Sequence, residues 1–471
     1  MHRLILSLTL FALPLRAQFL EDALRLARLD GYGTPRAGAL GIGFTALAND
    51  IGALGYNPAG LTSIAGIEAT GGLFFAHNST QTSFLTTTTP AVSNSTALTH
   101  LGIATSERWN NTNVALAVAY ALDNDYETSL RYSAFNPTSS IVAYWTRAAL
   151  NLRENWAFRL YLADTVNGRM VTPVQDSVQQ DGFVRERGGL HSLTGGIACE
   201  LSRWVSVGFT VALKYGRFTY SRDYRETDIL NRYNWLDTVQ FANVDFSALQ
   251  LREDLTQELS GITGSFGLLF RMENFFRAGL AIHFPTFFQV RERFSSDATA
   301  IFDNGDQKRL REDGQNSYNV RTPFVFSGAI AVHIPQFGLT FTAGAAYSDV
   351  TQLEFTDAPW EILQLNRLIL EQLVGQTLWG AGVEWDVPGL PATVRASLNN
   401  ITSPYGRDIA GATTTILAAG AALYLAPNIR LDFLLRRLEV SELRTSYGDQ
   451  VSYITTRRLL TLAAALTYRY R

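Results

Sequence analysis

The stretch Val205-Ser-Val-Gly-Phe-Thr-Val-Ala-Leu-Lys-Tyr-Gly216 decides the fold class of this chain. Large apolar side chains stand at every second position, and small or polar residues fill the positions between them. Because successive side chains of a β-strand point to opposite faces, this alternation predicts a strand with one apolar face. Strands of soluble proteins usually run about 5–6 residues, whereas a tilted strand that crosses a bilayer needs about 9–11. The length of this stretch favours a membrane strand.

The same alternation recurs along the chain, and the joins between strands are alternately short and long. Further alternating stretches cover 337–348, 429–436 and 460–470. The short joins lie near 202–203, 272–274, 334–336, 387–391 and 426–428, and the long, polar ones near 166–187, 220–257, 291–320, 351–374, 403–410 and 441–454. Outer-membrane barrels have this asymmetry, with short periplasmic turns and long extracellular loops.

We therefore expect an all-β chain that forms a transmembrane antiparallel β-barrel, with a large secreted β-protein such as a propeller as the alternative. Counting the alternating segments gives sixteen strands. Fourteen is equally open from the pattern, because the stretch from Ile141 to Leu150 alternates poorly and could be a helix.

Composition excludes several classes of protein. The chain has 471 residues, of which 46% are hydrophobic and only 17% charged, and its 39 basic and 42 acidic residues argue against nucleic acid as a partner. The single cysteine, Cys199, excludes a disulfide framework and a multi-thiolate metal site. No stretch after the N-terminus has the roughly 18 uninterrupted apolar residues of a spanning helix. We expect no cofactor and no metal.

The N-terminal residues indicate export. Basic Arg3, the apolar run from Leu4 to Leu15 and the small residue Ala17 predict a secretory signal peptide over residues 1–17. An exported chain without disulfides is typical of the bacterial cell envelope, so we expect a location in the bacterial outer membrane.

Residues 18–65 lack strand alternation and are expected to form a hatch that plugs the lumen of a barrel formed by residues 66–471. Leu20, Ala23, Leu24 and Ala27 have the spacing of a short amphipathic helix, and a glycine-rich segment follows. Irregular backbone at membrane depth is tolerated where protein encloses it, and a barrel lumen would do so.

Within this segment, Arg36-Ala-Gly-Ala-Leu-Gly-Ile-Gly-Phe-Thr-Ala-Leu-Ala-Asn-Asp50 and then Asn57-Pro58-Ala59-Gly60 resemble the hatch signature of the FadL/TodX family of outer-membrane transport proteins. The resemblance is sharp over about 30 residues. It implies a monomeric, 14-stranded barrel with an N-terminal hatch and a route for hydrophobic molecules, so we expect fourteen strands rather than sixteen. The asparagine of such a turn is expected to bond nearby backbone and hold the plug against the wall.

Candidate ligand contacts lie in two apolar segments. In loop 351–374, Pro359 begins a helix-compatible segment whose apolar residues include Trp360, Leu363 and Leu368; these residues either pack on another loop or form a groove that captures hydrophobic ligands. The resemblance favours the groove, because family members use extracellular loops for initial capture. Phe19, Leu20 and Leu24 of the N-terminal helix are further candidates.

The sequence thus predicts a passive uptake channel for hydrophobic molecules such as long-chain fatty acids or hydrocarbons. Its partners would be outer-membrane lipid and a hydrophobic small molecule, and the ligand would leave through the wall or past the plug. A barrel partner of a secretion system, like the PorV-type proteins, is one alternative, because those also carry an Asn-Pro-Ala-Gly hatch. An outer-membrane enzyme is another, although the sequence has no HExxH motif and no Gly-x-Ser-x-Gly elbow.

Overall fold

The computed structural model describes residues 18–471 apart from 32, 110–111, 149–151, 153, 234–244, 273–274, 449–450 and 471, and the side chains of residues 18, 19 and 148 are likewise outside the description. The signal peptide predicted over residues 1–17 therefore lies outside the described residues.

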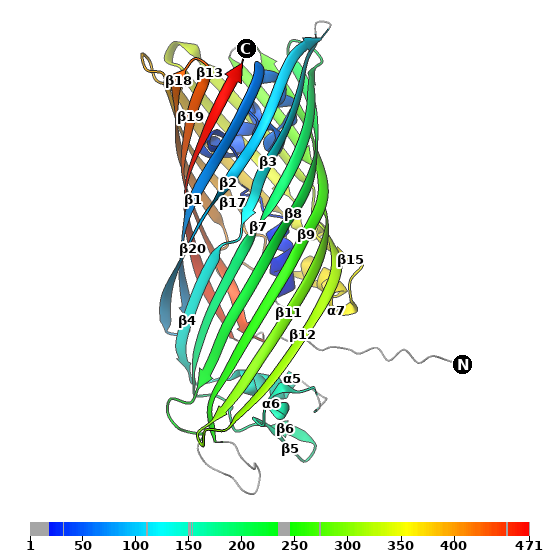
Figure 1. Cartoon of the computed structure of the whole chain (residues 1–471), viewed down its shortest axis with the longest axis vertical. Coiled ribbons are helices and arrows are strands. Elements are labelled where there is room, and N and C mark those ends of the chain that lie inside the picture. The colour runs from blue at the N-terminus through cyan, green and yellow to red at the C-terminus, as the bar shows by residue number, and fades with distance from the viewer. Residues whose placement is uncertain are drawn as a thin grey trace, which may run out of the picture.

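Antiparallel strands form one closed barrel (Figure 1). The segments of its wall are β1 (Gly66–Phe84), β2 (Thr87–Trp109), β3 (Thr112–Asp125), β4 (Thr128–Asn136), β7 (Val178–Glu200), β8 (Val205–Thr227), β9 (Phe246–Met272), β10 (Phe276–His283), β11 (Phe287–Phe302), β12 (Gln307–Arg321), β13 (Val325–Ile334), β14 (Leu339–Ser348), β15 (Glu354–Thr356), β16 (Gln376–Asp386), β17 (Ala392–Ile401), β18 (Thr414–Ala426), β19 (Ile429–Tyr447) and β20 (Val451–Tyr470). The last strand pairs with the first, from Ile67 opposite Tyr470 to Ser83 opposite Ile454, and this pairing closes the wall.

The wall has fourteen strands, as expected from the resemblance, because four of them are each built from two consecutive segments. β3 and β4 both pair with β7, and β10 and β11 both pair with β9. β13 and β12 continue one strand opposite β10 and β11, and β14 and β15 continue the next. The eighteen segments therefore make fourteen passes, and the count of sixteen is wrong.

Two helices replace the strand pair that the count of sixteen required. α5 (Ile141–Ala148) and α6 (Trp156–Arg159) lie with the short hairpin of β5 (Asp164–Val166) and β6 (Arg169–Val171) at the end of the barrel opposite the C-terminus (Figure 1). Ile141, Val142 and Trp145 are buried on one side of α5, which is helical spacing. These elements form a cap whose apolar side chains pack into this end of the lumen.

Several predicted long loops are instead largely strand. β8 and β9 cover much of 220–257, and β11 and β12 cover most of 291–320. The sequence pattern did not predict strands there because the outward face of these strand ends is polar. In β12, outward Arg311 and Asp313 replace the apolar residues that mark a strand within the bilayer.

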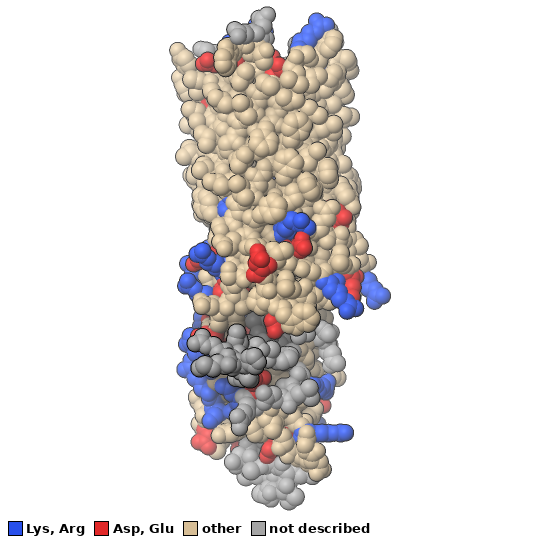
Figure 2. Space-filling model, turned by 90° about the vertical axis from the view of Figure 1, so that its right-hand side faces the viewer, with Lys and Arg blue, Asp and Glu red and all other residues tan. Residues whose placement is uncertain are grey.

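An apolar belt surrounds the half of the barrel that holds the short turns. Figure 2 shows that charged side chains are rare on this half and begin near mid-height on the face in view. Outward residues of β20 illustrate the belt, because Leu460, Leu462, Leu466 and Tyr468 are all exposed. A closed barrel with such a belt is built for a bacterial outer membrane, with the short turns on the periplasmic side. Among the described residues, no helix has the length and apolar character needed to cross a membrane.

Short helices lie inside the periplasmic half of the barrel. α2 (Pro35–Leu40), η2 (Gly41–Gly43), α3 (Phe44–Leu47), α4 (Ala53–Tyr56) and η3 (Pro58–Ser63) contact wall strands on every side, and residues 35–63 are called the hatch below. α1 (Gln18–Leu26) lies further along the lumen, toward the cap (Figure 1). The barrel interior is thus occupied by the hatch, α1 and the cap in turn.

Candidate functional site

The turn around Asn57 joins the hatch to the wall. The Asn57 Nδ2 group donates to the carbonyl oxygens of Thr45 and of Leu268 on β9, both at 3.0 Å. Its Oδ1 atom accepts from the backbone N–H of Ala59 at 3.2 Å. Asn57 is fully buried and extended (φ −153°), the conformation that a following proline favours. One side chain therefore fixes the turn, the α3 helix of the hatch and a barrel strand at once.

Glycines in the wall make room for this turn. A Cβ atom on Gly267 would lie 2.1 Å from Asn57 Oδ1, and one on Gly208 would lie 2.4 Å from the backbone nitrogen of Ala59. On the next strand, a Cβ atom on Gly279 would lie 2.1 Å from the carbonyl oxygen of Thr45. These three glycines were not among the site residues predicted from the sequence. The signal was glycine in the interior of a strand, which marks a close backbone approach.

A chain of buried ion pairs anchors the other side of the hatch. Arg36 donates two hydrogen bonds to the carboxylate of Glu384 on β16, from Nε at 2.9 Å and from Nη2 at 2.7 Å. Arg395 of β17 bonds the same carboxylate at 2.6 Å and reaches Asp432 of β19 at 2.9 Å, where Arg430 is also bound at 2.6 Å. The wall residues of this network were missed, although charged residues at inward positions of membrane strands were a readable signal.

α1 lies against both the wall and the two helices of loop 351–374. Leu20 and Ala23 are buried, and Leu24 packs beside them. Burial raises the pKa of Glu21 to about 7, with help from Glu442 and Glu186 and against the opposing charges of Arg444 and Arg25. The side chain of Phe19 lies outside the described residues.

Two helices, α7 (Trp360–Leu363) and α8 (Leu365–Gln372), lie where neighbouring strands are short. β16 begins at Gln376 and β17 ends at Ile401, whereas β12 and β19 continue further toward the cap (Figure 1). The inner face of the two helices is fully buried against α1 through Ile362, Leu365 and Ile369. The helix pair thus covers a notch in the wall.

The predicted ligand contacts divide between the two faces of this helix pair. Leu368 is partly buried in the same cluster as Leu20 and Leu24, whereas Trp360 is 68% exposed and Leu363 also faces outward. The structure therefore brings Leu20, Leu24 and Leu368 together inside the barrel and leaves Trp360 and Leu363 on its outer surface. Their contact with a ligand stays a prediction.

A cavity of about 340 Å³ lies between the hatch and α1. Apolar side chains line much of it, among them Leu26, Leu54, Ala212 and Ala346. Its cations already have partners: Lys214 bonds Asp123 at 2.6 Å, Arg28 pairs with Asp30, and Arg436 donates to the carbonyl oxygen of Asp30 at 2.9 Å.

The cavity reaches the wall at a break in two strands. Phe284 and Pro323 line it, and they lie in the gaps between β10 and β11 and between β12 and β13. Pro285 and Pro323 have no N–H group to give to the ladder, and the rings of Phe284 and Phe324 meet edge to face at 6.3 Å. This break was not predicted from the sequence, although prolines inside a strand pattern are a signal for one.

Comparison with known proteins rests on structure alone, because no family model and no curated protein matches the sequence. A Pseudomonas aeruginosa FadL homologue matches with a TM-score of 0.59 at 12% identity, over 94% of this chain and 100% of that one. The chain has the FadL fold. The P. putida toluene transporter TodX (TM-score 0.57, 11% identity) and the Ralstonia pickettii toluene transporter TbuX (0.51, 14%) match over the same shares of the two chains. Two of these three neighbours are thus named as toluene transporters.

In this FadL-type barrel, we expect Asn57→Ala to loosen the hatch without unfolding the wall. The change removes all three hydrogen bonds of a fully buried side chain, a loss of roughly 2–4 kcal/mol in hatch docking. The heat-modifiable gel shift of the barrel should persist, while amide exchange in residues 35–63 rises and uptake of a hydrophobic probe changes. The exposed-turn variant Asn304→Ala is the control and should match the wild type. Wild-type protection of the hatch in Asn57→Ala would contradict this expectation.

Proposed function

We propose that this chain is a passive outer-membrane channel that takes up small hydrophobic molecules. The observation that carries the proposal is the largely apolar cavity between α1 and the hatch. Its volume of about 340 Å³ lies within the range of sites that bind small molecules. Solved structures with the same fold include channels named for toluene, which supports the same substrate class.

We propose that the ligand enters beside α8. The inner face of this helix packs on Leu20 and Ala23 of α1, and the next turn of α1 brings Leu26 to the cavity lining. An apolar path therefore leads from the notch in the wall to the cavity. The outward residues Trp360 and Leu363 would make first contact with the ligand at the notch, and Leu20, Leu24 and Leu368 would pass it inward.

Exit through the wall is the route that the contacts favour. The hatch is held by Asn57 on one side and by the Arg36–Glu384 pair on the other, so passage past it would break buried polar contacts. Opening the wall would cost less free energy than displacing the hatch, because the cavity already touches Phe284 and Pro323 where the strands are broken. Turning aside the ring of Phe284 would connect the cavity to the bilayer.

The electrostatics of the cavity favour an uncharged ligand over a carboxylate. Lys214, Arg28 and Arg436 all bond to Asp123 or Asp30, so a fatty-acid carboxylate would have to displace an existing partner. Of the two ligand classes expected from the sequence, we therefore place neutral hydrocarbons before long-chain fatty acids.

Filling the cavity tests this proposal. Ala212 faces the cavity, so Ala212→Trp should reduce uptake of a labelled monoaromatic hydrocarbon about tenfold, equivalent to losing about 1.4 kcal/mol of ligand binding. Val211, the preceding residue, faces lipid, and Val211→Trp is the matched control that should transport normally. Uptake is measured in cells with equal surface levels of each barrel and compared with cells that lack the protein. Equal uptake in all of these cells would overturn the proposed channel function and favour the alternative, a barrel partner of a secretion system.

A further inference from the structure

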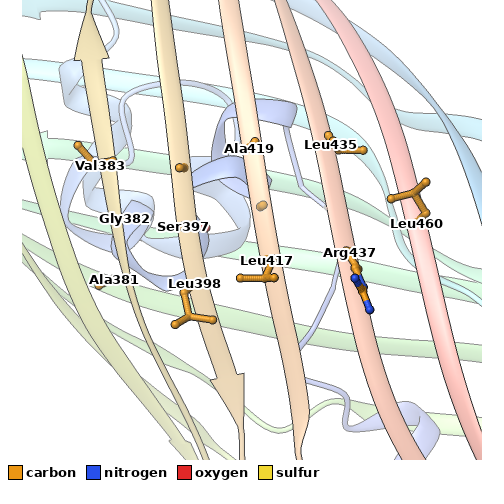
Figure 3. Close-up of a pocket in the computed structure, with 12 residues that line it drawn as sticks. Ala381, Gly382, Val383, Ser397, Leu398, Leu417, Ala419, Leu435, Arg437 and Leu460 are labelled. Atoms are coloured by element: carbon orange, nitrogen blue, oxygen red, sulfur yellow. The ribbon is translucent and has the colours of Figure 1, made fainter.

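A second pocket opens on the outer surface of the wall, away from the lumen. It has a volume of about 610 Å³ and spans β16 to β20 (Figure 3). Ala396 of β17 and Ala419 of β18 lie directly opposite each other and form its floor. Val383 and Leu435 follow in the same cross-strand row on either side and form its walls. Two short side chains between two longer ones leave a hollow in the barrel surface.

The next row toward the outer face of the membrane closes one end of this hollow. Leu398 and Leu417 lie opposite each other, and Arg437 of β19 follows Leu417 in the row. Figure 3 shows Arg437 beside this leucine pair at the edge of the pocket. The pocket therefore has an apolar floor and a cationic end.

The position of the pocket decides what can fill it. Outward residues on the periplasmic side of Arg437 are apolar along β19, where Phe433 and Leu435 are exposed. On β20 the outward series is apolar from Tyr470 to Leu460 and becomes charged at Arg458. The hollow thus lies inside the apolar belt, where only hydrocarbon chains contact the wall, and its cationic end lies at the edge of that belt.

Two guanidinium groups at this edge share one carboxylate. Arg437 Nη2 lies 2.8 Å from Glu439 Oε2, and Arg458 Nε lies 3.3 Å from Glu439 Oε1. The two arginine side chains are well exposed and Glu439 is partly exposed, and together the three carry one net positive charge. Guanidinium groups bind phosphate with paired hydrogen bonds, and basic residues at a membrane surface attract acidic lipids.

We propose that this pocket binds an acidic, phosphate-bearing lipid of the outer leaflet, for which phosphatidylglycerol serves as the probe. One acyl chain lies over Ala396 and Ala419 between the flanking larger side chains, and the phosphate group is bound by Arg437 and Arg458. The site is separate from the lumen and from the channel activity proposed above. It would fix one lipid on the β16–β20 face and set the depth of the barrel in the membrane.

Spin-label electron paramagnetic resonance tests the proposal on the full-length protein in phosphatidylcholine nanodiscs. Spin-labelled phosphatidylglycerol should be immobilised in preference to spin-labelled phosphatidylcholine of the same chain length. Arg437→Gln combined with Arg458→Gln should reduce this preference by about fivefold for each arginine removed. Ala419→Trp, which fills the hollow, should remove the site-bound immobilised component for both lipids.

Arg309→Gln is the matched control, since Arg309 is an exposed arginine paired with Asp297 beyond the belt, and it should leave the preference unchanged. An equal preference in the wild type and in the double arginine variant would overturn the proposal. The proposal would also be overturned if soluble glycerol phosphate displaced spin-labelled phosphatidylglycerol as strongly as unlabelled phosphatidylglycerol does, because the site would then bind only an anion. The arginine variants keep the test valid if Ala419→Trp fails to fold.

Discussion

Arg36→Met is expected to release the hatch while the barrel stays closed. Arg36 makes a two-point contact with Glu384 in the barrel interior, and removing one partner of a buried ion pair costs about 3–5 kcal/mol. We expect the lower end of this range, because Arg395 still faces Glu384 in the variant. A loss of about 3 kcal/mol raises the undocked population of the hatch on the order of a hundredfold.

Hydrogen exchange and channel conductance measure this release. Amides of residues 35–63 should exchange faster and ion conductance in planar bilayers should rise, while the heat-modifiable gel shift of the barrel persists. Arg36→Met with Glu384→Gln removes both charges and should recover part of the docking. Arg367→Met is the control, since its pair with Glu371 on α8 is exposed and contributes about 0.5 kcal/mol or less. Unchanged hatch protection in Arg36→Met would show that the network does not anchor the hatch.

Ile369→Asp is expected to lift α8 out of the notch in the wall. Ile369 is fully buried between α1 and the wall, and an ionised carboxylate placed there without a partner costs several kcal/mol. Because burial raises the pKa of such a carboxyl group, the docked helix is favoured when the group is protonated. Docking should therefore recover as the pH falls and be lost again as it rises.

Exchange protection across residues 360–372 reports this movement. Leu370→Asp is the matched control on the same helix, because Leu370 is 69% exposed and its replacement buries no charge. Wild-type protection of Ile369→Asp at neutral pH would contradict the expected displacement of α8.

The wall could be predicted from the sequence because the bilayer imposes a simple pattern. Within the apolar belt every outward residue must be apolar, so stretches such as Val205–Tyr215 alternate clearly. Beyond the belt the outward face meets water, and the alternation is lost although the strand continues. This is why β12, with Arg311 and Asp313 outward, was expected to be a loop.

The interior was harder to predict, because its contacts join distant parts of the chain. The motif at Asn57 could be read from adjacent residues, but its acceptor on β9 is 211 positions away. The pair of Arg36 and Glu384 spans 348 positions. Nothing local distinguishes Glu384 from any other strand carboxylate, so its role emerges only from the paired strands. The lining of the cavity depends in the same way on residues of the N-terminal segment and of most wall strands.

The seam between β1 and β20 has a consequence for the order of assembly. It joins the first and last strands of the wall, so it cannot form until the whole chain is present. The hatch precedes every strand, yet it contacts late strands such as β16, β17 and β19 as well as early ones such as β7 and β8. Contacts this remote in sequence form slowly. We therefore expect the open sheet to curl around the hatch and gain these late contacts as it closes, with the seam between β1 and β20 forming last.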